Sequence, residues 1–171
     1  MPPQLFRNRG QAQFQELTSQ GLGPYFQQRY RGRGLARLDW NRDGREDFVV
    51  SHLDAPVALL TNQTKQHGNH LAVQLVGTAS SRDAIGSRVT VTSGDNSWTA
   101  QLTAGDGYQA SNQRQLVFGL GQHNQLDKLT VHWISGATQT FTKLPLNAEI
   151  RIVEGQHSYS LLSKNNDSAN E

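Results

Sequence analysis

The chain contains no cysteine, which excludes disulfide bonds, zinc–thiolate sites and thiol catalysis. No apolar run comes near the ~20 residues that a transmembrane helix needs, so we expect no membrane insertion. The first residues, MPPQLFRNRG, lack the hydrophobic stretch of a signal peptide. We therefore expect either a cytoplasmic protein or an internal piece of a longer one. An extracellular location stays open, because calcium can stabilise a domain that has no disulfides.

Sequence motifs of common enzymes are also missing. There is no G-x-S-x-G nucleophile elbow, no H-E-x-x-H zinc motif and no glycine-rich phosphate loop. The carboxylates around Asp39 could form a hydrolase pair, but a cation bound among them would occupy them. We therefore expect no enzymatic activity.

Net charge is low and unevenly distributed. A formal charge of +2 is too small by itself to imply a polyanionic partner. Residues 1–37 nevertheless hold six arginines and a single acid, Glu16. The segment RYRGRGLAR interleaves arginine with an aromatic residue, as some nucleic-acid-binding segments do. Because it runs directly into a predicted strand, we interpret it as an exposed, positively charged strand edge and expect no nucleic-acid partner.

Residues 66–157 show the hydrophobic alternation of β-strands, with period two. Turn sequences such as SGDN and ISGAT separate the alternating runs. About seven short, half-buried strands predict an antiparallel sandwich, and a closed barrel remains the alternative. The predicted strands centre on residues 71–75, 89–91, 98–102, 116–120, 129–133, 141 and 150–152.

The first 65 residues have a different organisation. Residues 2–23 predict two short strands and a loop, and residues 32–64 predict a strand, an acidic loop and two further strands. The phrases PPQLFRNRG and APVALLTNQT indicate an internal repeat of about fifty residues, the period of a propeller blade or related array. The polar residues 158–171 predict a disordered tail.

The acidic loop, DWNRDGRED at residues 39–47, places four carboxylates in nine residues. Oxygen-bearing side chains fall at positions 1, 3, 5 and 9, with Gly44 at position 6, and this alternation suits calcium. Val50 stands where an EF-hand has its last glutamate, so we predict an EF-hand-like loop between strands. Glu46 is expected to point to the other face, and a solvated acidic turn is the alternative. The predicted calcium ligands are the side chains of Asp39, Asn41, Asp43 and Asp47 and the backbone carbonyl of Arg45.

Other polar and aromatic residues have structural interpretations. His67 and His70, in HGNH, lack a third metal ligand, and we interpret them as part of a solvated linker. Trp98 and Trp133 are in phase with apolar neighbours and are expected in the core. Tyr108 lies in a predicted loop and is the better candidate for a ligand contact.

The segment GRGLARLDWNRDGREDFVVSHLDAPVALLTN resembles the last FG-GAP (integrin-like) repeat of proteins that end in an ASPIC/UnbV domain. The segments GNHLAVQLVGTASSRDAIGSRVTVTSG, GYQASNQRQLVFGLG and LTVHWISGATQTF are similar to successive signatures of that domain. The resemblance covers about residues 4–154, with Ile134 where a proline is expected. Relatives such as cartilage acidic proteins carry several FG-GAP repeats, bind calcium through such a loop, and many are secreted or surface-exposed.

This resemblance implies an all-β chain with three parts: an incomplete FG-GAP propeller-type repeat at residues 1–65, an antiparallel ASPIC/UnbV β-sandwich at residues 66–157, and the tail. A closed propeller needs at least about four blades, so we expect the C-terminal portion of a larger protein. The implied function is a non-enzymatic, calcium-binding module for binding or adhesion, located outside the cell or at its surface. The alternative is a glycan- or small-molecule-binding accessory domain of a carbohydrate-processing or secondary-metabolism system. Expected partners are a protein or glycan ligand at the cell surface, together with self-association through unpaired strand edges.

Overall fold

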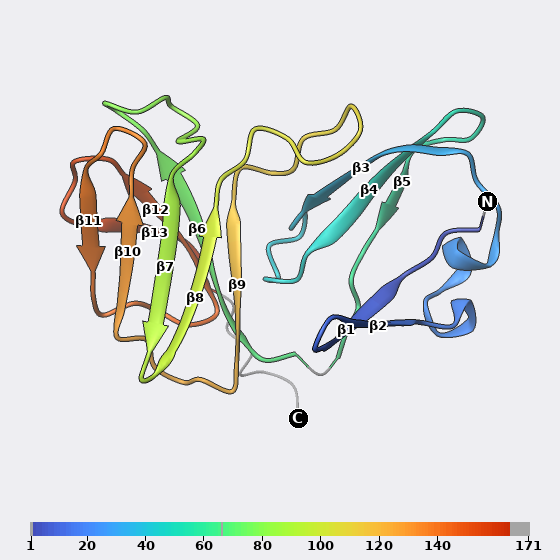
Figure 1. Cartoon of the computed structure of the whole chain (residues 1–171), viewed down its shortest axis with the longest axis horizontal. Helices are drawn as coiled ribbons and strands as arrows, with labels where there is room; N and C mark the ends of the chain where they lie inside the picture. Colours follow the sequence, from blue (N-terminus) through green and yellow to red (C-terminus); the bar gives the residue numbers. More distant parts are fainter. Residues whose placement is uncertain (1, 66, 165–171) are drawn as a thin grey trace.

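The structure is a computed structural model that describes residues 2–65 and 67–164 (Figure 1). Within these residues every regular element is a β-strand or a short 3-10 turn, which confirms the predicted all-β class. The strands form four open sheets, and none of the described sheets closes into a propeller. No helix in the described ranges is long and apolar enough to cross a membrane.

The N-terminal part contains two small sheets. One is a hairpin of β1 and β2, and the other has the order β3-β4-β5. The elements of this part are β1 (Phe6–Gly10), β2 (Gln13–Glu16), η1 (Ser19–Gly21), η2 (Pro24–Gln27), β3 (Gly32–Leu38), β4 (Asp47–His52) and β5 (Ala58–Leu60).

The remaining strands form a sandwich of two four-stranded sheets, ordered β11-β10-β7-β8 and β13-β12-β6-β9. Alternate residues of each sheet point inward, so that Val89 and Val131 of the first sheet and Leu71 and Ile150 of the second are fully buried in one core. Each such side chain stabilises the fold by roughly 1.5–3 kcal/mol. The sandwich strands are β6 (Asn69–Val76), β7 (Arg88–Ser93), β8 (Asn96–Gln101), β9 (Leu116–Gly121), β10 (Lys128–His132), β11 (Thr138–Phe141), β12 (Ala148–Val153) and β13 (Tyr159–Lys164).

Two features of the sandwich differ from the sequence prediction. The sheets are not purely antiparallel, because β12 runs parallel to β6 in the centre of its sheet. An eighth strand, β13, pairs with β12 where a disordered tail was expected to begin. Residues 159–164, YSLLSK, include Tyr159 and two leucines and pair with β12 through backbone hydrogen bonds. The rest of the expected tail, residues 165–171, lies outside the described residues.

The N-terminal part has almost no core of its own. Val50 is the one buried hydrophobic residue in the described range 2–65, and all residues of β1 and β2 are exposed. The contacts of this part with the sandwich include hydrogen bonds and an ion pair, such as those of Arg37 with Asn112 and of Arg42 with Glu149. A part with so little buried apolar surface depends on its neighbour for stability.

One contact between the two parts covers the free edge of β3. The backbone of Arg37 donates to Asn112 Oδ1 (2.8 Å) and accepts from the backbone N–H of Gln113 (2.9 Å). Gln113 Oε1 then accepts from the backbone N–H of Asp39 (2.8 Å). The loop between β8 and β9 therefore occupies backbone groups that would otherwise invite strand addition.

Candidate cation site in the acidic loop

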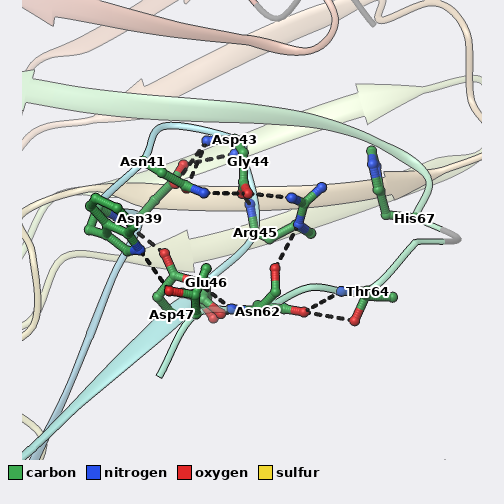
Figure 2. Close-up of polar contacts among 12 residues, drawn as sticks. Asp39, Asn41, Asp43, Gly44, Arg45, Glu46, Asp47, Asn62, Thr64 and His67 are labelled. Carbon is green, nitrogen blue, oxygen red and sulfur yellow. Dashed lines mark hydrogen bonds and ion pairs between the residues drawn. The ribbon is translucent and has the colours of Figure 1, made fainter. Parts of the chain in front are cut away.

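The acidic loop joins β3 to β4 and lies beside the sandwich (Figure 2). Two of its carboxylates are withdrawn from solvent, since Asp39 is 6% exposed and Asp47 is fully buried. Buried carboxylates require hydrogen bonds or a cation to offset the loss of hydration. The predicted ligands are thus brought together in one loop, and the question is what satisfies their oxygens.

Backbone N–H groups satisfy the two buried carboxylates. Asp39 accepts hydrogen bonds from the N–H groups of Asp43 (3.0 Å) and Gly44 (2.9 Å). Asp47 accepts from the N–H groups of Asn62 (2.7 Å) and Trp40 (3.3 Å). These bonds fold the loop around its own acids and tie it to the segment after β5.

Asp43 has different partners. Its carboxylate accepts from the Asn41 amide (2.7 Å), from the backbone N–H of Arg45 (2.9 Å) and from the Arg45 guanidinium. The Arg45 side chain also donates to the carbonyl of Asn62 (2.9 Å). We predicted only a carbonyl contribution from Arg45, whereas its side chain supplies a positive charge to the loop (Figure 2).

Burial and, to a smaller extent, neighbouring negative charge affect the ionisation of Asp39. Burial raises the pKa of Asp39, the N–H groups of Gly44 and Asp43 lower it in part, and the negative charges of Asp43 and Asp47 raise it again. The ionised form of this carboxyl is therefore disfavoured in the folded loop. A cation would reverse that balance.

The donor set fits a hard cation in chemistry, because the predicted ligands offer only oxygen atoms. Among residues 2–65 and 67–164, no group of three or more His, Asp or Glu side chains is arranged in a way that could hold a metal ion. Binding would therefore require the carboxylates to exchange some bonds to N–H groups and to Arg45 for the ion. Glu46 is turned away and pairs with Arg37 (3.1 Å), in keeping with its predicted exclusion from the ligand set.

The loop packs on the outer face of the β13-β12-β6-β9 sheet. Leu71 points into the core, so its strand neighbours His70 and Ala72 point outward, yet they are only 6% and 2% exposed. The ring of His70 lies against Gly44, and Arg42 approaches the buried Glu149 (3.8 Å). The interpretation of HGNH as a solvated linker is wrong for His70, which the loop covers.

Gly44 is required at this contact. Its φ of +79° lies in the left-handed region, and a Cβ at this position would come within 2.0 Å of His70 Nε2. The spacing of the loop predicts a glycine at position 6 for the backbone turn, but it does not predict that the His70 ring of β6 leaves no room for a side chain there.

The remaining candidates separate clearly. Trp133 is 4% exposed and lies in the core, as predicted. Trp98, on β8, is partly buried and packs against the core. Tyr108 is 65% exposed in the loop that follows β8. Sequence reasoning missed Asn62, Glu149 and the role of His70, because each meets the loop only through the tertiary fold.

Comparisons with known proteins gave one match, which lies within the sandwich. A search of curated proteins found no match, and no FG-GAP repeat was detected. One family model, described as ASPIC and UnbV, matches residues 77–158. The sandwich is larger than this match, because β6 precedes it and β13 follows it. Residues 77–158 therefore form an ASPIC/UnbV domain.

Proposed function

We propose that this chain is a non-enzymatic, calcium-stabilised binding or adhesion module that works outside the cell or at its surface. The observation that carries the proposal is the acidic loop, in which Asp39 and Asp47 are both buried and Asp43 lies between them in the sequence. Mutual repulsion of three carboxylates is costly in a partly desolvated loop, and a divalent cation removes it.

The ligands would come from alternate residues of the loop. Asp39, Asn41, Asp43 and Asp47 would bind calcium through side-chain oxygens, and Arg45 through its backbone carbonyl. Calcium would supply positive charge and hold the loop closed. The Arg45 guanidinium, which pairs with Asp43, would give up that contact and keep its hydrogen bond to the carbonyl of Asn62.

We further propose that residues 1–65 are an incomplete FG-GAP repeat. Support comes from the strand–loop–strand order of β3, the acidic loop and β4, and from the sparse core of this part. Its contacts with the ASPIC/UnbV domain would make calcium a stabiliser of both parts together. The expected partner is a protein or glycan at the cell surface.

Calorimetric titration of the full chain with calcium chloride tests the proposal. Calcium should also raise the melting temperature, since a ligand at 100 times its Kd stabilises the folded state by about 2.7 kcal/mol. Asp43→Ala should abolish both signals, and the matched variant Glu46→Ala should keep them, because Glu46 faces Arg37. Absence of binding at millimolar calcium would reduce the loop to an acidic turn held by its own backbone.

A further inference from the structure

The outer face of the β11-β10-β7-β8 sheet is a regular array of hydroxyl groups. Val89 and Val91 of β7 point into the core, so Arg88, Thr90 and Thr92 point outward. The strand register aligns one threonine from every strand in a single row across the sheet. This row consists of Thr99, Thr90, Thr130 and Thr140.

Rows on either side continue the pattern. We call the complete set the hydroxyl face, and each of its side chains is exposed or half-buried. Its eleven members include seven serines or threonines, none is acidic or aliphatic, and the only ring is the imidazole of His132. The hydroxyl face comprises Arg88, Thr90, Thr92, Ser97, Thr99, Gln101, Lys128, Thr130, His132, Thr138 and Thr140.

Two permanent cations flank the threonine row. Arg88 lies in the row on one side, and Lys128 lies in the row on the other. Because strands are spaced about 4.8 Å apart and rise about 3.4 Å per residue, the face is a regular grid of polar side chains, with one cation in the row on each side of the threonines. Within the grid, Thr90 and Thr99 join their hydroxyls at 2.9 Å, and Thr130 and Thr140 at 3.4 Å.

We propose that the hydroxyl face is the docking surface for a carboxylated polysaccharide. Carboxylates would pair with Arg88 and Lys128, and sugar hydroxyls would exchange hydrogen bonds with the threonine row. A surface with two cations and no acid is complementary in charge to such a polymer. This inference rests on the proposed role as a binding module, for which it names the partner class, but it does not depend on the calcium site.

The same composition disfavours other partners. Single-stranded nucleic acids bind through successive bases stacked on aromatic side chains, and the hydroxyl face offers only the imidazole of His132 and no Phe, Tyr or Trp. Protein interfaces are centred on buried aromatic, methionine or arginine anchors in an apolar setting, and this face lacks aliphatic residues. A regular array of polar side chains, most of them short hydroxyl residues, suits a polymer that presents hydroxyls along its length.

Binding of the full chain to carboxymethyl-dextran, compared with unmodified dextran, tests the inference because the two polymers differ only in their carboxylates. Arg88→Gln/Lys128→Gln should weaken binding at least about tenfold, since charge-assisted hydrogen bonds are lost. Thr90→Val/Thr130→Val should weaken it while the melting temperature is retained, because valine keeps the β-branched shape. The control Arg31→Gln/Arg33→Gln removes the same charge from the exposed N-terminal segment and should leave binding intact.

Several results would overturn the inference: no binding to carboxymethyl-dextran, equal binding to dextran, tighter binding to oligodeoxythymidine, or a loss that follows the control pair instead. All measurements are made in EDTA and repeated with calcium and with Asp43→Ala. If the chain binds the polysaccharide but calcium neither binds nor raises the melting temperature, the cation site alone is refuted. A calcium response without polysaccharide binding refutes the hydroxyl face alone.

Discussion

Replacing Gly44 by alanine tests whether the acidic loop packs on the sandwich as described. The φ of +79° at this position costs a non-glycine residue roughly 1–2 kcal/mol. The new Cβ would also lie 2.0–2.3 Å from three atoms of the buried His70 ring, which must move. Overpacking of this kind costs roughly 1–3 kcal/mol. We therefore expect Gly44→Ala to lower the free energy of unfolding by roughly 2–5 kcal/mol in all.

Gly155→Ala is the matched control for backbone strain. Gly155 has a φ of +82°, yet no atom lies within 4 Å of its would-be Cβ, so only the conformational cost of roughly 1–2 kcal/mol applies. Urea denaturation of the full chain, followed by tryptophan fluorescence and circular dichroism, measures both variants. His70→Ala should recover part of the Gly44→Ala loss in a double-mutant cycle. Equal losses for the two glycine variants, or no coupling to His70, would refute the contact.

Three further predictions concern acid, calcium and the connection between the two parts. Burial would raise the pKa of Glu154, but hydrogen bonds from Ser135, from Thr78 and from the N–H and hydroxyl of Ser80 lower it from 4.5 to about 2. The stabilisation that ionised Glu154 gives the fold is thus complete above pH 4.5 and is lost as pH falls toward 2. In urea denaturation, Glu154→Gln should therefore be less stable than the parent chain at pH 7 and match it near pH 2. Calcium binding should weaken as pH falls through the raised pKa of Asp39, because the protonated carboxyl must release its proton before it binds the ion. Calorimetric titration at several pH values measures the number of protons released, and a number that does not change with pH would contradict this. Limited proteolysis should cut first within residues 61–68, where most side chains are exposed, and a resistant fragment spanning this segment would count against it.

Period-two alternation is sufficient to predict most of the sandwich. Strands with clear inward and outward residues, such as β7 and β10, carry the pattern because one face packs in the core and the other meets water. The strand β13 lacks this signal, since its sequence YSLLSK has two successive leucines instead of an alternation, and Leu161 is 54% exposed. The parallel pairing of β12 with β6 also escapes prediction, because strand order depends on contacts far apart in sequence.

The acidic loop shows the same limit at the level of a site. Its ligand spacing is local, so the positions of Asp39 and Asp47 follow from the sequence. The partners that bury them do not, because Asn62 comes from beyond β5 and His70 from the sandwich. Ligand spacing assigns position 7 only a carbonyl role and does not predict the ion pair of the Arg45 side chain with Asp43, which stabilises the negative charge of the loop.

The two outer faces of the sandwich have different environments, and this separates the two proposed sites. At one face the acidic loop packs against His70 and Glu149, both of which are buried. The other, the hydroxyl face, keeps its side chains in contact with water. Because the core lies between them, a cation in the loop touches no residue that a polymer on the hydroxyl face would touch. A ligand shifts an equilibrium only by its differential affinity for the two states, so calcium would act on the partner through the stability of the folded chain rather than through direct contact.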